Sequence, residues 1–290
     1  MSGFRIPLAL TAAFAAAAVL VAASAAVAQD TATPPKPEMR EGCPGLIAQR
    51  APRLRLAARD GAGLQLAALA ADELRITYIG HSTFLLESPR LVRIATDYND
   101  YVRPPVVPDV VTMNHAHSTH YTDRPDPAIK HVLRGWSTEY GKPARIDMQV
   151  QDVRIRNVPT NIRVWGTNGT EPHGNSIFIF EVGALCVAHL GHLHHTLTQQ
   201  QLDEIGRIDV VMVPVDGSYT LDLDGMVEVL QSLKAPLMIP MHFFSSYTLD
   251  NFLRRLGELD WTVERAEVPS VVVSKATLPA KPKVLVLPGR

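Results

Sequence analysis

Excess charge of one sign is missing from this chain of 290 residues, because 28 Lys and Arg residues nearly balance 29 Asp and Glu residues. We therefore expect no broad basic surface and no nucleic-acid partner. The sequence also shows no internal repeat, and no apolar run after the N-terminal segment is long enough to span a membrane. With 46% hydrophobic residues, the chain can bury a substantial core in one large domain or two small ones.

Cysteine is scarce as well, since the sequence has only Cys43 and Cys186. In an exported protein these two residues could form one disulfide. Cys186 lies in the apolar run GALCVAHL, so the alternative is that it is a small buried hydrophobic residue. The sequence leaves both interpretations open.

The N-terminal segment has the features of an export signal. One Arg precedes a long Ala-rich apolar run, which ends in the A-V-A cleavage motif at positions 26–28. We predict a signal peptide over residues 1–28 and, because no twin-Arg pair is present, Sec-type export to the periplasm or the medium. After cleavage we expect no stable membrane insertion. The alternative is an uncleaved membrane anchor, because the apolar run approaches spanning length.

A change in composition predicts where the folded domain begins. Residues 29–73 combine a Pro-rich linker, DTATPPKPE, with an Ala-, Leu- and Arg-rich part that favours short helices. Over residues 74–290 the pattern first gives many strand-like runs and then strands that alternate with helices. The expected helices are TLTQQQLDEIG, LDLDGMVEVLQSL and SYTLDNFLRRLGEL. This order predicts an α+β fold with two sheets and helices outside them.

Histidines are the most informative residues, because six of them stand next to the ends of predicted strands. The run DVVTMNHAHSTH places three of them directly after an apolar strand. The six are His115, His117, His120, His173, His192 and His242. Binding residues are often found in loops that a rigid sheet positions, and imidazole is a good ligand for Zn and similar metals. The pattern therefore predicts a metal site.

Ordered motifs from residue 74 onward resemble those of the metallo-β-lactamase-fold hydrolases. The motifs are ITYIGHSTFLLES, IATDYND, VVTMNHAHSTH, EPHGNSIFIFE, VAHLGH, IDVVMVPVDGSYTLD and MIPMHFF. They are most similar to the branch that includes ascorbate-6-phosphate lactonase, and the match runs from residue 74 to the end. The resemblance implies a four-layer αββα sandwich with a metal site at one edge of the paired sheets. The lactonase suggests a small anionic substrate.

The resemblance also implies a role for individual residues. The ligands of a first metal would be His115, His117 and His173, and those of a second metal would be His120 and His242, which His192 could join if a nearby acid helps. The supporting residues would be Asp97, Thr119 and His81, and the possible substrate contacts are Asp216 and Tyr219.

Two of these positions depart from the family pattern, because Thr119 and His192 stand where the family usually has carboxylates. Neutral imidazoles bring no negative charge, so two metal ions buried close together would be poorly compensated. We therefore rank one metal ion above two. Zn is the expected ion, with Fe and Mn as alternatives.

Together these features predict a metal-dependent hydrolase that acts on a small molecule. Metal-bound hydroxide would attack an ester, lactone, amide or phosphoester. The two replaced carboxylates motivate an alternative, a non-catalytic or weakly catalytic protein of the same fold that binds metal or ligand. The substrate and the oligomeric state do not follow from the sequence.

Overall fold

The computed structural model describes residues 68–289. The predicted signal peptide, nearly all of the predicted linker and helical extension, and Cys43 lie outside these residues. Cys186 is inside them and is fully buried. Across the described range, no helix has both the length and the apolar character needed to cross a membrane.

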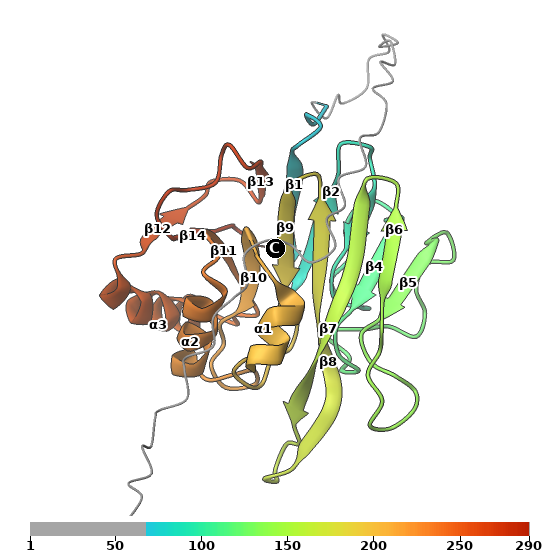
Figure 1. The fold of residues 1–290 in the computed structure, drawn as a ribbon, viewed down its shortest axis with the longest axis vertical. Helices are drawn as coiled ribbons and strands as arrows, with labels where there is room; N and C mark the ends of the chain where they lie inside the picture. The colour runs from blue at the N-terminus through green and yellow to red at the C-terminus, as the bar shows by residue number, and fades with distance from the viewer. Residues whose placement is uncertain (1–67, 290) are drawn as a thin grey trace, which may run out of the picture. The chain divides into compact units, whose positions relative to one another are not determined.

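Two β-sheets form the centre of the described part (Figure 1). The first sheet has six strands in the order β13-β1-β2-β3-β4-β5. Its strands are β1 (Leu74–Gly80), β2 (Thr83–Glu87), β3 (Arg93–Ala95), β4 (Val110–Met113), β5 (His131–Arg134) and β13 (Ser270–Val273). It is mixed, because β1 to β3 pair antiparallel whereas β3, β4 and β5 pair parallel.

The second sheet has eight strands in the order β12-β14-β11-β10-β9-β8-β7-β6. Its strands are β6 (Asp147–Val150), β7 (Val153–Arg163), β8 (Thr170–Val182), β9 (Leu185–His189), β10 (Val210–Pro214), β11 (Leu237–Met241), β12 (Thr262–Arg265) and β14 (Lys283–Val286). The hairpin of β7 and β8 contains the longest strands of the described part, and it extends beyond the other strands at the lower end of Figure 1.

Alternation along the strands of the second sheet separates its two faces. In β8, Phe178 and Phe180 belong to the core between the sheets, whereas Ile177 and Ile179 belong to the core under the helices. Successive side chains of a strand point to opposite faces, so a run that is apolar throughout is buried on both sides. The run SIFIFEV, with its high content of apolar residues, is therefore typical of a central strand that is buried on both faces.

The helices α1 (Gln199–Ile205), α2 (Leu223–Leu233) and α3 (Ser246–Leu256) all lie on one side of the second sheet (Figure 1). Each begins at a side-chain cap, and the cap residues are Thr198, Asp222 and Ser245. Such side chains accept hydrogen bonds from otherwise unpaired backbone N–H groups of the first turn. The three predicted helices are thus confirmed, with starts two or three residues later for the first two.

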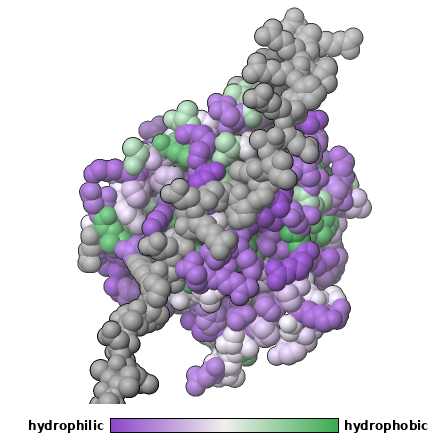
Figure 2. All heavy atoms as spheres, viewed as in Figure 1, coloured by the Kyte–Doolittle hydropathy of each residue, from purple (hydrophilic) through white to green (hydrophobic). Residues whose placement is uncertain are grey.

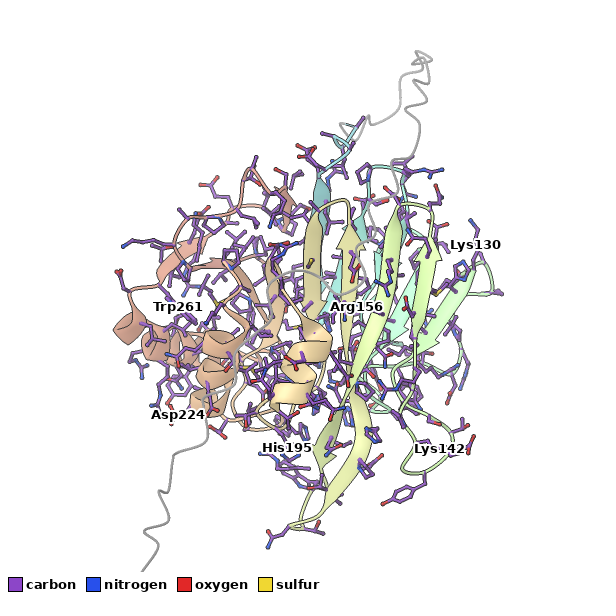
Figure 3. All side chains as sticks on the ribbon, in the orientation of Figure 1. Lys130, Lys142, Arg156, His195, Asp224 and Trp261 are labelled. Carbon is purple, nitrogen blue, oxygen red and sulfur yellow. The ribbon has the colours of Figure 1, made fainter. Side chains whose placement is uncertain are left out.

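The predicted two-sheet sandwich is confirmed, and the helices of the described residues occupy one outer layer. The outer face of the first sheet is covered instead by a small cluster made with loop residues, among them Tyr98 and Ile129. Arg156 links the second sheet to α1, because its guanidinium donates to the carbonyls of Glu204 and Ile205 at the end of that helix (Figure 3).

Candidate metal centre

Six histidines converge where strands of both sheets end. They are His81, His115, His117, His120, His192 and His242, which we call the histidine cluster. Neighbouring rings have centroids between 4.4 and 6.3 Å apart. His81 follows β1, the next three occupy the loop after β4, and the last two follow β9 and β11. Figure 3 labels His195 on the loop that carries His192, at the lower edge of the sandwich.

Several residues here have an unfavourable backbone conformation. His81, Asp97 and His242 have φ angles of 52°, 44° and 54°, in the left-handed region that side chains other than glycine rarely adopt. Such strain persists only where the surrounding structure enforces it, and it is common at functional sites. The backbone at these three residues therefore orients their side chains in a strained conformation, which costs free energy that an ordinary turn does not.

A buried carboxylate holds His120. The Nδ1 atom of His120 lies 2.7 Å from Oδ2 of Asp97, and both side chains are fully buried. Asn114 donates its backbone N–H to the other oxygen of Asp97 at 2.9 Å. Because Nδ1 of His120 is engaged in this way, its Nε2 lone pair is directed into the cluster.

A second buried carboxylate holds His242 in the same manner. Nδ1 of His242 lies 2.9 Å from Oδ1 of Asp216. The remaining capacity of Asp216 is taken by Thr220 Oγ1 and by the backbone N–H groups of Ser218, Tyr219 and Thr220. Asp216 therefore orients a histidine and shapes its loop.

The other members of the cluster have neutral partners. Nδ1 of His115 donates to the carbonyl of Gly174 at 2.8 Å, and Nδ1 of His117 lies 3.0 Å from Thr119 Oγ1. His81 Nδ1 lies 3.1 Å from Ser82 Oγ. Nδ1 of His192 lies 2.9 Å from Nε2 of His120, which places these two nitrogens side by side.

Three histidines of the cluster meet the spacing that a metal ion requires. His81, His120 and His242 each offer one nitrogen, and these nitrogens lie within 4.8 Å of one another. Two of the three are backed by carboxylates, an arrangement that fixes the tautomer and strengthens an imidazole as a ligand. The donor set therefore fits a divalent transition metal such as Zn.

Burial lowers the pKa of several histidines of the cluster. Burial, assisted by neighbouring imidazoles, lowers the pKa of His120 and His192 well below the ordinary value of histidine. Burial and His242 lower the pKa of His81 to about 4. Burial also raises the pKa of Asp97. For Asp216 burial acts upward, but the hydrogen bond and charge of His242 outweigh it and hold the pKa well below its usual range. Neutral imidazole is the form that binds metal.

His173 lies outside the histidine cluster as defined above, and its place in the first metal site stays a prediction. The pairing of β7 with β8 shifts between Thr160 and Ile162, so three residues of β8 stand opposite Asn161. His173 lies in this bulge with φ of 58°, and its backbone N–H donates to Asn161 Oδ1. His173 is among the residues that line a smaller depression beside Trp136. A bulge interrupts the regular alternation of side chains along a strand, so the sequence pattern alone did not predict the surroundings of His173.

Beside the histidine cluster lies a cavity of about 820 Å³. The predicted residues that line it are His81, His115, His117, Thr119, His192, Tyr219 and His242. Asp216 is not among the residues that line it, and its oxygens accept hydrogen bonds from His242 and from its own loop, so the expected substrate contact by Asp216 stays a prediction. Asp97 lies behind His120 and has the supporting position that was expected.

Other cavity residues were missed at the level of sequence. They are Ile162, Arg163, Val164, Trp165, Glu171, His194 and Phe244. Proximity to the motifs was the only available signal, for His194 beside His192 and for Phe244 beside His242. Nothing in the sequence indicated that the β7–β8 loop, which carries Trp165, lies close to the histidine cluster.

Comparison with known proteins gives consistent matches. The family model described as beta-lactamase superfamily domain matches residues 75–242. A metal-dependent hydrolase of Archaeoglobus fulgidus is 26% identical over 196 residues, which cover 59% of this chain and 83% of that protein. A metal-dependent hydrolase of Opitutus terrae is 29% identical over 199 residues, covering 60% of this chain and 86% of that protein.

Solved structures show the same fold. A Thermotoga maritima protein, named as a Zn-dependent hydrolase of the metallo-beta-lactamase superfamily, has a TM-score of 0.54 and 29% identity. The match covers 75% of this chain and 100% of the Thermotoga maritima chain. A metallo hydrolase of Ignicoccus hospitalis has a TM-score of 0.52 at 20% identity, covering 70% of this chain and 99% of the other, and shows the fold alone.

Proposed function

The chain belongs to the beta-lactamase superfamily, and from this premise we propose that it is a metal-dependent hydrolase of a small molecule. The bond that it cleaves is an ester, lactone, amide or phosphoester. The relatives named above as metal-dependent hydrolases support this proposal. The observation that carries it is the histidine cluster, in which two imidazoles are held by buried carboxylates beside a cavity.

The proposed metal position is the group of His81, His120 and His242. His120 and His242 present Nε2 because their Nδ1 atoms face Asp97 and Asp216. His192 can complete the set, because its Nδ1 lies 2.9 Å from Nε2 of His120. This position differs from the predicted first site, which needed His173.

Charge favours one ion in this position. Asp97 and Asp216 stand one hydrogen bond behind two of the proposed ligands, and two carboxylates compensate one divalent cation. A second buried cation would need further negative charge, and an uncompensated buried charge is costly. We propose Zn as the ion, with Fe and Mn as the alternatives that elemental analysis separates.

The residues of the chain then have distinct tasks. When bound, the ion supplies Lewis-acid polarisation of the scissile group and activation of water. His115 donates its Nδ1–H to Gly174, so its Nε2 can accept a hydrogen bond from water or substrate in the cavity. Thr119 restrains His117 at the same wall. The buried side of the cluster excludes bulk water, which strengthens these polar contacts.

Substitution of His120 tests the proposal directly. We expect His120→Ala to reduce bound metal from about one ion per chain to less than a tenth, since it removes a central ligand. His173→Ala should leave metal content unchanged, because His173 lies outside the cluster. Elemental analysis of both purified proteins, after growth with Zn, Fe and Mn, measures the difference.

Turnover decides between a hydrolase and a metal-binding protein without activity. The metal-loaded protein is tested against a panel of esters, lactones, amides and phosphoesters, and it should hydrolyse at least one of these classes. Chelation of the metal should abolish this activity, and added metal should restore it. Retention of metal without turnover of any substrate class would favour the non-catalytic alternative. Equal metal loss in the His120 and His173 variants would reject the proposed position.

Export remains part of the proposal. The segment 1–28 suggests action in the periplasm or outside the cell. Fractionation of cells that express the full chain, and of cells that express a chain without residues 1–28, tests it. Mature protein that stays with the membrane fraction would favour the anchor instead.

A further inference from the structure

Three exposed aromatic side chains line the cavity, and they come from three separate loops. Trp165 lies between β7 and β8, Tyr219 lies between β10 and α2, and Phe244 follows β11. Their exposed fractions are 74%, 54% and 60%. Large aromatic surfaces left in water are costly, and when they gather at a cavity they mark a place that a ligand covers.

The three rings form a continuous row from the cavity mouth to the proposed metal position. Trp165 and Tyr219 are stacked, with centroids 5.8 Å apart and an angle of 19° between their planes. Tyr219 meets Phe244 edge-on at 5.6 Å. Phe244 in turn lies 5.3 Å from His242 and 5.9 Å from His81. A ligand along this row would reach the metal ligands without leaving aromatic surface.

Hydrogen bonds hold the two outer loops of the row together. Arg163, two residues before Trp165, donates from one guanidinium nitrogen to the carbonyls of Ser218 and Thr220, at 3.0 and 2.9 Å. These carbonyls flank Tyr219. The backbone N–H of Tyr219 is in addition held by Asp216, the residue that orients His242. The row is therefore built before a ligand arrives, which reduces the entropy lost on binding.

The charges around the cavity do not suit a strongly anionic substrate. Apart from the histidines, the charged residues that line it are Arg163 and Glu171, one of each sign. Arg163 already serves the link between the loops. Recognition of a phosphate usually relies on several cationic or N–H donors aimed at it. The charges that line the cavity thus do not favour the small anionic substrate that the resemblance to the lactonase suggested.

Position distinguishes this row from ordinary surface residues. Single exposed hydrophobic side chains are normal, and the face in Figure 2 carries mainly hydrophilic residues with small scattered hydrophobic patches. Tyr140 is an example among the described residues, since it is 87% exposed and lines a different depression. Trp165, Tyr219 and Phe244 instead contact one another inside the cavity that holds the histidine cluster.

We propose that Trp165, Tyr219 and Phe244 form a subsite for a flat apolar group, such as a phenyl ring, attached next to the hydrolysed bond. The substrate class is then an aryl-bearing, uncharged ester, lactone or amide. This inference rests on the proposed metal-dependent hydrolase function, because it uses the metal position to define where the bond lies.

Binding of hydroxamates to the metal-loaded protein tests the subsite without requiring turnover. Acetohydroxamate and benzohydroxamate share the metal-chelating group and differ in the methyl or phenyl group beside it. Calorimetric titration should show benzohydroxamate binding at least ~10-fold more tightly, since a stacked ring buries apolar surface and gains aromatic contacts. Heptanohydroxamate, whose alkyl chain has as many carbons as the phenyl ring, should bind less tightly than benzohydroxamate.

Trp165→Ala should remove most of the phenyl advantage and leave the affinity for acetohydroxamate and the metal content unchanged. Trp165 is exposed in a loop, so its removal spares the core. Tyr140→Ala is the matched control and should keep the full advantage of the phenyl compound.

Equal affinities for the methyl and the phenyl compound would overturn the subsite and leave the metal site standing. An equally tight heptanohydroxamate would overturn the preference for a flat group. Failure of both small hydroxamates to bind would overturn the metal position and the subsite with it.

Discussion

At the scale of single residues, two aspartates explain how a site rich in neutral histidine can hold a cation. Asp97 and Asp216 are buried, and each meets the Nδ1 atom of one proposed ligand. The negative charge that the loop after β4 lacks at Thr119 is thus supplied from behind the imidazoles. A carboxylate in that position orients the ring and raises the basicity of its other nitrogen.

Asp216→Asn is expected to weaken metal binding by about 10–100-fold, the usual effect of removing such a partner. The amide cannot accept from His242 and from the three backbone N–H groups at once, because one of its two heavy atoms is a donor. Competition with a chelator of known affinity measures the change. Asp123→Asn is the control, since Asp123 is an exposed carboxylate in the loop after β4, 3.9 Å from Arg134. Similar losses in both variants would argue for a general charge effect.

At the scale of elements, the loop after β9 depends on a close approach of backbone to side chain. Gly191 has φ of 61°, and a Cβ at this position would lie 2.4 Å from Asn114 Nδ2 and 2.5 Å from Asn175 Oδ1. These two amides hold the carbonyl of Ser176 and the backbone N–H of His192. The glycine therefore lets the β9 loop sit against β8 and deliver His192 to the cluster.

Gly191→Ala should destabilise the protein by about 3 kcal/mol, the sum of a left-handed alanine and a displaced pair of amides. Gly141→Ala is a matched control, because Gly141 has φ of 74° and no atom within 4 Å of the added Cβ. In Gly141→Ala the free energy of unfolding should fall by only about 1–2 kcal/mol, the cost of placing alanine in the left-handed region. Urea unfolding of both variants measures the difference, and equal losses would contradict a packing role for Gly191.

At the scale of the whole molecule, buried histidines make stability depend on pH. His189 is fully buried, donates from Nε2 to the carbonyl of Ser82 and accepts at Nδ1 from Gly191. Burial lowers its pKa, as it does for His115, His120 and His192. Each of these groups binds a proton more readily in the unfolded chain than in the folded one.

Metal-free protein should therefore lose stability as the pH falls below about 6.5, the pKa of an unfolded histidine. The raised pKa of Asp97 acts in the opposite sense, but it is one group against several histidines, which include His81. The lowered pKa of Asp216 matters only below its unfolded value, outside this window. Urea unfolding at pH 7.5 and pH 5.5 should differ by at least about 2 kcal/mol. Equal or greater stability at the lower pH would contradict neutral burial of these histidines.

Much of the fold could be predicted because central strands and capped helices carry strong local patterns. LRITYIG matches β1 over residues 74–80, and the three helices begin at Ser, Thr or Asp caps. The strands β5, β6 and β12 were missed, since they are short and partly or fully exposed, with little apolar alternation. The narrower resemblance to ascorbate-6-phosphate lactonases stays a prediction.

The two-sheet sandwich and the histidines at strand ends could be predicted from the sequence alone, because apolar runs followed by short polar loops are local properties. The superfamily was predicted from the resemblance of ordered motifs. Which histidines meet depends on the tertiary structure. His81, in the turn after β1, comes together with His120 and His242, whereas His173 lies in the bulge between β7 and β8. The tertiary structure also decided that Asp216 supports His242 and that Trp165, Tyr219 and Phe244 form one row. These outcomes depend on strand pairing and loop approach between segments far apart in the chain, which no local pattern encodes.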